Sequence, residues 1–163
     1  MSVFFFAGVL IIAVLDQLVK SIVVNKLMSY SSVPVIDGVF HFTYCENSGA
    51  GFGVFSGYTW ILSLLTILIV LAVMAYVLVK KPSDKLLMVS LTLMIGGAVG
   101  NLIDRLRLGY VIDFLDFRLI NFPIFNIADC FITIGAIVFA VYVIFFSDKK
   151  ECADEHNEGE RNR

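Results

Sequence analysis

The sequence predicts an all-α membrane protein with four transmembrane helices and a small β platform on the extracytoplasmic face. Two observations lead to this fold class. First, 59% of the 163 residues are hydrophobic and only 16% are charged, with a mean hydropathy of +0.90, which is far more apolar than a typical soluble domain. Second, four apolar segments reach the roughly 17 to 25 residues that a helix needs to cross the hydrocarbon core of a bilayer.

Counting apolar residues gives four expected helices, at about residues 3–24, 58–79, 86–103 and 127–146. The polar run KKPSDK, residues 80–85, separates the middle two, and Pro82 stops the earlier helix. Because this turn is so short, the two helices it joins are antiparallel neighbours. Residues 1–146 therefore form one membrane domain, and residues 147–163 form a tail too polar to fold alone.

The orientation of the helices follows from the tail, because lysine and arginine are equally frequent on the two sides of the membrane. The tail holds six acids and four bases, which is more at home in the cytoplasm. We therefore expect both termini to be cytoplasmic, and the two long connections, 25–57 and 104–126, to share the outer face. The acids and bases of residues 1–146 balance at eight each, so no nucleic-acid partner is expected.

The first long connection has the pattern of a β hairpin. It contains VPVIDGVFHFTY, in which β-branched and aromatic residues flank the turn dipeptide Asp37-Gly38. Such residues favour strands, and the dipeptide favours a tight turn. We expect this segment to form the β platform at the membrane face.

Asp129 stands at the start of the fourth expected helix, directly before a long uncharged run. An acid at this depth must be paired, hydrated or shifted in its pKa. The second long connection offers three partner acids, Asp104, Asp113 and Asp116, and the residues alone do not choose among them. Two carboxylates in a low-dielectric site share a proton, so they can act as base and acid in the attack of water on a peptide carbonyl.

Structural roles and other function classes compete with catalysis. A proton-coupled transporter would also need membrane acids, but four helices without an internal repeat leave little room for alternating access. In a structural scaffold, the acids would affect stability only. The local structural alternatives are helix capping by Asp129 or Asn126, ion pairs Asp104–Arg105 and Asp16–Lys20 at the interface, and close helix packing by Gly96, Gly97 and Gly100.

No metal ion or other cofactor is expected. The three cysteines are scattered without a repeated spacing, and the two histidines lie in no H-x-x-H pattern. A zinc site of the usual histidine and cysteine type needs such spacings.

Five motifs, taken together and in order, resemble those of lipoprotein signal peptidase, also called signal peptidase II. They are DQLVK at 16–20, ENSGAGFG at 46–53, GGAVGNLIDR at 96–105, VIDF at 111–114 and FNIAD at 125–129. The resemblance covers residues 10–135. It implies an aspartyl protease of the bacterial inner membrane that removes the signal peptide from prolipoproteins, cutting before a diacylglyceryl-modified cysteine. Its expected partners are these substrates and membrane lipid, and a monomer is expected.

The same resemblance assigns roles to individual residues. The catalytic pair it implies is Asp113 and Asp129. The chain departs from the usual family pattern at Gly51, where the family has alanine, and we expect this to loosen the loop without affecting the pair. The remaining implied roles are substrate binding by Asn47, Gly49, Asn101, Arg105 and Asn126, and structural support by Asp16, Lys20 and Asp104.

Overall fold

Four long helices and a three-stranded sheet make up the computed structural model, which describes residues 1–30, 32–49 and 57–147. All four helices are long and apolar enough to cross a membrane, so the expected fold class is confirmed. The tail from residue 148 onward lies outside the described residues. The helices are α1 (Ser2–Leu27), α2 (Thr59–Lys80), α3 (Lys85–Leu108) and α4 (Ile127–Tyr142), and α4 continues as a π-helical turn, η3 (Val143–Ser147).

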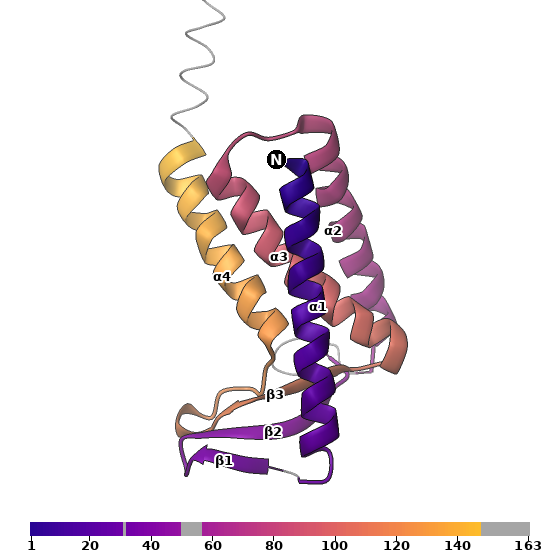
Figure 1. Ribbon diagram of the computed structural model, residues 1–163, viewed down its shortest axis with the longest axis vertical. Helices are drawn as coiled ribbons and strands as arrows, with labels where there is room; N and C mark the ends of the chain where they lie inside the picture. The colour runs from indigo at the N-terminus through magenta and orange to yellow at the C-terminus, as the bar shows by residue number, and fades with distance from the viewer. Residues whose placement is uncertain (31, 50–56, 148–163) are drawn as a thin grey trace, which may run out of the picture.

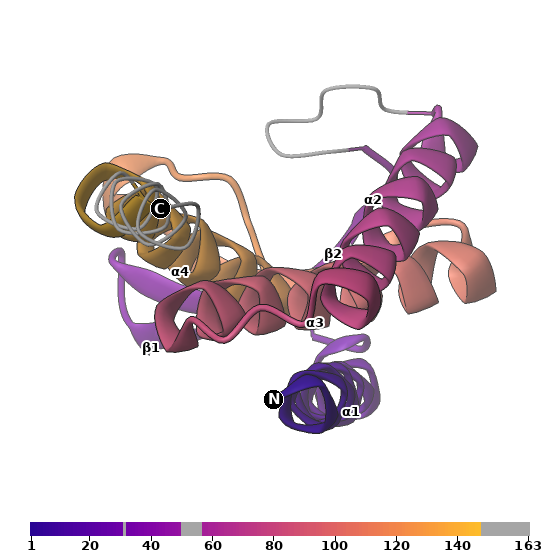
Figure 2. The same ribbon diagram turned by 90° about the horizontal axis from the view of Figure 1, so that it is seen from above.

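Helix α3 occupies the centre of the bundle and packs against the other three helices. Seen from above, α1 lies on one side of α3, while α2 and α4 lie on the other (Figure 2). Small residues allow this close approach. A Cβ atom on Gly100 would come within 2.6 Å of a carboxylate oxygen of Asp16 on α1, and one on Gly97 would meet the backbone of Ala128 on α4. The expected packing role of these glycines is therefore confirmed.

The antiparallel sheet has the strand order β1-β2-β3 and joins the two long connections. The hairpin of β1 (Ser32–Ile36) and β2 (Phe40–Asn47) turns at Asp37-Gly38, where Gly38 has a φ of 69°, as the sequence predicted. Strand β3 (Val111–Phe117) pairs with β2. The sheet lies at one end of the bundle, and the N-terminus and the C-terminal end of α4 lie at the other (Figure 1).

Two expectations about the third helix and the connection that follows it were wrong. Helix α3 runs five residues past the expected end at residue 103 and stops at Gly109, which has a φ of 84° and donates its N–H to the carbonyl of Arg105. Asp104 and Arg105 are therefore helical. The connection itself contains β3, which the sequence analysis did not anticipate, followed by a single 3-10 turn, η2 (Arg118–Ile120).

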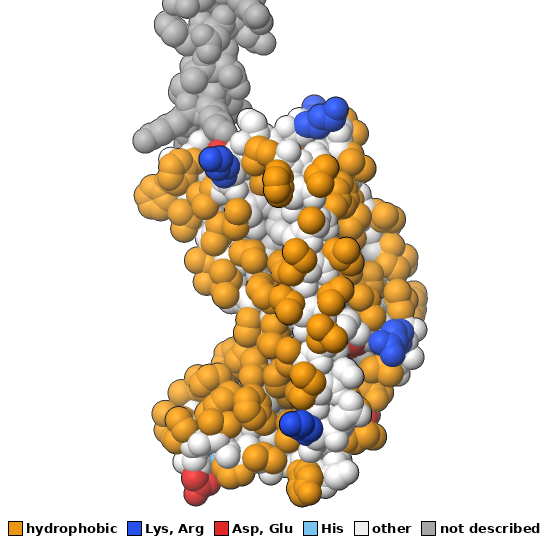
Figure 3. All heavy atoms as spheres, viewed as in Figure 1, with side chains coloured by type: hydrophobic (Ala, Val, Ile, Leu, Met, Phe, Trp, Pro, Cys, Tyr) orange, Lys and Arg blue, Asp and Glu red, His pale blue; other side chains and the backbone are white. Residues whose placement is uncertain are grey.

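The distribution of side chains is the one expected for a protein immersed in lipid. Apolar side chains cover the visible face of the helices (Figure 3), and large ones such as Phe4 and Trp60 are 81% and 67% exposed. In contrast, Asp16, Lys20 and Asp104 are at most 2% exposed. A soluble protein rarely exposes such an extensive apolar surface, so this surface is suited to hydrocarbon. The three charged side chains lie inside the protein.

Candidate active site

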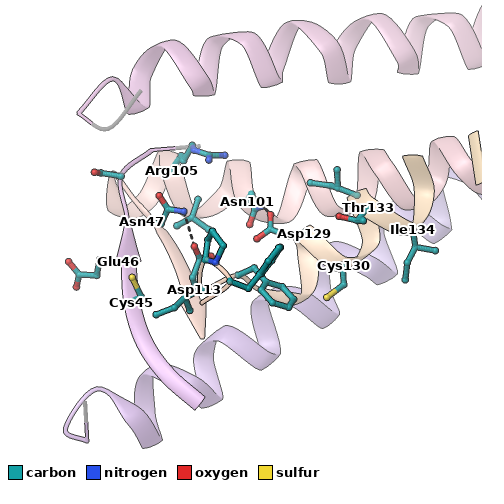
Figure 4. Close-up of a pocket in the computed structure, with 17 residues that line it drawn as sticks. Cys45, Glu46, Asn47, Asn101, Arg105, Asp113, Asp129, Cys130, Thr133 and Ile134 are labelled. Carbon is teal, nitrogen blue, oxygen red and sulfur yellow. Dashed lines mark hydrogen bonds between the residues drawn. The ribbon is translucent and has the colours of Figure 1, made fainter. Parts of the chain in front are cut away.

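A cavity of about 990 Å³ lies where α3, α4 and the sheet meet (Figure 4). Its lining divides into two parts. One part is polar, and the other is formed by the segment before α4 and the first turns of that helix. The polar lining includes Glu46, Asn47, Asn101, Arg105, Asp113 and Asp129, and the apolar lining includes Phe122, Pro123, Ile124, Phe125, Ile132 and Ile134.

Asp113 reaches this cavity from β3, opposite Cys45 of β2 in the strand ladder. Only 1% of Asp113 is exposed. Its two carboxylate oxygens accept hydrogen bonds from the side-chain amides of Asn126, at 2.6 Å, and Asn47, at 2.8 Å. Burial raises the pKa of Asp113 to about 6; the negative charge of Asp129 adds to this rise, and the two amides oppose it.

Asp129 reaches the same cavity from the first turn of α4. Its backbone N–H donates to the side-chain oxygen of Asn126, at 3.0 Å, and its Oδ2 accepts the backbone N–H of Asn126, at 3.1 Å. This reciprocal pair is a capping box, so the expected capping role is confirmed for both residues. Asp129 is only half-buried and lines the cavity, so capping fixes its position while leaving it accessible to a ligand.

Two asparagines connect the acids. The Nδ2 group of Asn126 donates to Asp113 and to the side-chain oxygen of Asn101, at 3.0 Å, and Asn101 donates in turn to Oδ1 of Asp129, at 2.8 Å. As a result, each of the four carboxylate oxygens of Asp113 and Asp129 accepts one N–H group. The geometry thus holds the two acids in one hydrogen-bonded unit at the cavity wall.

The other two candidate acids have different partners. Asp104 lies 2.8 Å from the ammonium group of Lys20, so the expected ion pair with Arg105 was wrong. Asp116 accepts hydrogen bonds from Thr43, at 2.6 Å, and from Arg118, at 2.9 Å, and it does not line the cavity. The structure therefore brings Asp113 together with Asp129 and occupies Asp104 and Asp116 elsewhere.

Arg105 connects α3 to the end of β2. Its Nη2 group donates to the carbonyl of Gly49, at 3.1 Å, and the N–H of Gly49 donates to the side chain of Asn47, at 2.9 Å. The Nε atom of Arg105 is buried and has no hydrogen-bond partner among the described residues. This guanidinium thus stands beside the acids with unused donor capacity. Gly51, where the chain departs from the family motif, lies outside the described residues.

A buried ion cluster lies next to the site and contacts one of its asparagines. Lys20 lies 2.8 Å from both Asp16 and Asp104 and donates to Asn101, at 2.9 Å. The expected pairing of Asp16 with Lys20 is confirmed, and both side chains are buried. The sequence analysis missed Gln17, which donates to Asp104 at 2.8 Å; its place inside the DQLVK motif was the available signal.

These features define a membrane protein of four helices with a cavity at the sheet end of the bundle and two linked carboxylates in its wall. A family model described as signal peptidase (SPase) II matches residues 8–145. The chain belongs to this family and is therefore a peptidase.

Similar proteins agree with this assignment over most of the chain. The lipoprotein signal peptidase of Clostridioides difficile (strain 630) is 43% identical over 137 residues, which are 83% of this chain and 90% of that protein. The lipoprotein signal peptidase of Caldanaerobacter subterraneus is 45% identical over 132 residues, covering 80% and 89%. A solved bacterial membrane enzyme superposes with a TM-score of 0.80 at 30% identity, covering 90% of this chain and 91% of that one.

Proposed function

We propose that this peptidase removes signal peptides from diacylglyceryl-modified prolipoproteins, cutting before the modified cysteine, with Asp113 and Asp129 as its catalytic acids. The names of the curated relatives support the prolipoprotein substrate. One observation supports the chemistry above all others: the two acids line one cavity and are joined through Asn101 and Asn126. No cofactor enters this proposal, since water and two carboxylates suffice for peptide hydrolysis.

The acids have different environments, and these suggest their roles. Asp113 is buried and its pKa is raised to about 6, so a fraction of the molecules carry its proton near neutral pH, and in this reactive form Asp113 donates a hydrogen bond to the peptide carbonyl. Ionised Asp129 takes a proton from water, whose oxygen adds to the carbonyl carbon. The C–N bond then breaks as the proton of Asp113 passes to the leaving amine. Asp129 is left protonated and Asp113 ionised, and proton exchange within the pair restores the starting state.

The rest of the cavity suits the two parts of the substrate. Asn47 and Arg105 line the cavity at the end of β2, where amide and guanidinium groups can bind an extended peptide backbone. Gly49 is buried and positions both of them through its own N–H and carbonyl. Asn101 lines the cavity and holds Asp129, whereas Asn126 is fully buried outside the cavity lining and would act on a substrate only through the acids that it holds. The apolar lining before and along the start of α4 suits the acyl chains of a lipid-modified cysteine.

The proposed location is the bacterial inner membrane, with both termini cytoplasmic and the acids near the outer lipid interface. The acidic composition of the tail supports this orientation. So does the arrangement in Figure 1, because the sheet and the site lie at the end of the bundle opposite the N-terminus. A lipid-anchored substrate presents its cleavage site at this depth. The acids would then be within reach of water from the outer face of the membrane.

The test uses purified full-length protein in detergent with a diacylglyceryl-modified prolipoprotein, followed by gel shift. Wild type is expected to cleave it, and Asp113→Asn and Asp129→Asn are expected to lose at least about 10³-fold in rate while remaining folded. Asp116→Asn is the matched control, because it removes a β3 acid that faces Thr43 and Arg118 and lies outside the cavity. It is expected to cleave like wild type.

The outcomes separate substrate from mechanism. If folded wild type does not process the lipid-modified prolipoprotein, the proposed substrate is wrong. If wild type cleaves and either cavity variant cleaves at a similar rate, the assignment of the acid pair is wrong.

A further inference from the structure

We infer that Lys20 is a positioning residue for the acid pair: its ammonium group holds the amide of Asn101 in the one orientation that donates to Asp129. The inference rests on the proposed function, because it assigns Lys20 a part in the same reaction. It goes beyond structural support, in which Lys20 would only neutralise buried acids.

The hydrogen bonds of Asn101 define a single amide orientation. Its Oδ1 atom accepts from Lys20, at 2.9 Å, and from Asn126, at 3.0 Å, and its Nδ2 group donates to Asp129, at 2.8 Å. Turning this amide over would set its NH₂ group against an ammonium and another NH₂ group, and its oxygen against a carboxylate. An amide has only one acceptor end and one donor end, so the turned state would lose all three bonds.

Lys20 has one N–H donor left to bind Asn101 after it has paired with two carboxylates. An ammonium group has three N–H donors. Two of them meet Asp16 and Asp104, each at 2.8 Å, and the third meets Asn101. Lys20 is 1% exposed and does not line the cavity. It therefore affects a substrate only through the groups that it holds.

The carboxylates around Lys20 tie it to the elements that present the acids. Asp16 accepts the backbone N–H of Ala128, at 3.1 Å, in the first turn of α4. Asp104 accepts the backbone N–H of Ile112, at 3.2 Å, the residue before Asp113 in β3. Lys20 is thus fixed relative to both segments, so its hydrogen bond to Asn101 keeps one direction.

Removing the charge of Lys20 is expected to act on the pH dependence of the pair as well. Its positive charge lowers the pKa of Asp113, against the larger effect of burial. Without it, Asp113 keeps its proton to a higher pH, and the basic limb of the rate profile, which reports the loss of that proton, moves upward. The titratable and charged groups facing the pair from the surrounding elements are Asp16 and Lys20 on α1, Cys45 and Glu46 on β2, Asp104 and Arg105 on α3, and Cys130 on α4.

The decisive variant is Lys20→Met, which keeps an unbranched side chain of similar length and removes the donor. The rate of cleavage of a diacylglyceryl-modified prolipoprotein is measured from pH 5 to 9 for folded protein, together with KM. We expect kcat to fall about 10- to 100-fold, KM to stay within about two-fold because Lys20 does not line the cavity, and the basic limb to move up by about half a pH unit or more.

Asp104→Asn is the matched control, because it breaks the same ion cluster and keeps Lys20 on Asn101. A purely structural role would lower the stability of both variants and leave kcat of folded Lys20→Met at the wild-type value. The charges alone move the basic limb in opposite directions, to lower pH when the negative charge of Asp104 is removed and to higher pH in Lys20→Met. The positioning role adds a loss of kcat that is larger in Lys20→Met than in Asp104→Asn. Wild-type kcat in folded Lys20→Met, or an equal loss in both variants, would overturn the inference.

Lys20→Met leaves Asp16 and Asp104 buried without their cation, which can prevent folding. In that case the combined variant Lys20→Met, Asp16→Asn, Asp104→Asn carries the test, because it removes the uncompensated charges. It is expected to fold and to retain the loss in kcat; recovery of wild-type kcat would reject the role of Lys20. Failure of wild type to cleave would reject the proposed function instead, so the two failures are distinguishable.

Discussion

Asp113→Asn is predicted to stabilise the protein while abolishing its activity. At neutral pH wild type holds an ionised carboxylate in a site where burial raises its pKa from 3.8 to about 6. A shift of one pKa unit corresponds to about 1.36 kcal/mol, so ionisation of Asp113 destabilises the folded state by about 3 kcal/mol relative to a protonated carboxyl group. An uncharged amide at this position does not pay that penalty.

Lost hydrogen bonds offset part of this gain. The carboxylate accepts one N–H from Asn126 and one from Asn47, whereas an amide has only one oxygen. One of the two donors therefore faces an NH₂ group, which costs about 1 to 2 kcal/mol. The expected net stabilisation at pH 7.5 is about 1 to 2 kcal/mol, which raises the unfolding temperature of a chain of this size by about 3–6 °C.

The stability difference between wild type and Asp113→Asn depends on pH. Because the folded-state pKa of Asp113 is raised, the folded state binds the proton more tightly than the unfolded chain. Wild-type stability from this group is then complete below about pH 4 and falls until the pH passes about 6. The variant lacks this titration. Its advantage over wild type should therefore be full above pH 6 to 7 and should vanish, or reverse, near pH 4.

Thermal unfolding in detergent, followed by the helical circular dichroism signal from pH 4 to 8, measures this difference. Asp116→Asn serves as the control of opposite sign. Burial alone would raise the pKa of Asp116, but hydrogen bonds from Thr43 and Arg118 outweigh it and lower the pKa, so neutralising Asp116 should reduce stability at neutral pH. A lower unfolding temperature for Asp113→Asn at pH 7.5, or a difference that does not change with pH, would refute the reasoning.

Two further predictions concern metal ions and helix packing. Cleavage should survive EDTA, because among the described residues no three histidine, cysteine, aspartate or glutamate side chains could together hold a metal ion; loss of cleavage in EDTA with rescue by a divalent ion would indicate a metal-bridged mechanism instead. Gly100→Ala should lower the free energy of unfolding by about 1–3 kcal/mol, because its Cβ would lie 2.6 Å from the carboxylate of Asp16. Thermal unfolding measures this effect, and an unchanged unfolding temperature would show that α1 and α3 can separate freely.

The helices were predictable because hydropathy measures what a bilayer requires of a chain. For the same reason, hydropathy did not predict the end of α3. Asp104 and Arg105 reduce the hydropathy, but the backbone hydrogen bonds of the helix continue to Leu108. Strand β3 was missed because its sequence, VIDFLDF, does not alternate between apolar and polar residues. The strand is buried on both faces, yet two acids interrupt its apolar run. Those acids are tolerated because partners distant in the sequence satisfy them, as Asn47 and Asn126 do for Asp113.

The identity of the pair could not be read from the residues for a related reason. Asp104, Asp113 and Asp116 all lie within reach of Asp129 along the chain, and only the tertiary partners distinguish them. Asp104 forms an ion pair with Lys20, and Asp116 accepts hydrogen bonds from Arg118 and Thr43. These contacts depend on helix packing and strand register, which a single sequence does not specify. The family motifs supplied the choice because they reflect the same tertiary constraints.

The helix cap and the proposed chemistry share one side chain at Asp129, and this decides how the site can be tested. The carboxylate that lines the cavity also accepts the backbone N–H of Asn126 in the capping box, so Asp129→Ala would remove a helix cap and the proposed catalytic base together. An asparagine at a capping position still offers an oxygen to that N–H, and it cannot take a proton from water. Only the isosteric change therefore separates the two functions. Capping and the proposed catalysis, which compete as explanations when the sequence is considered alone, are compatible in the structure, because the cap uses Oδ2 of Asp129 and the side chain still lines the cavity.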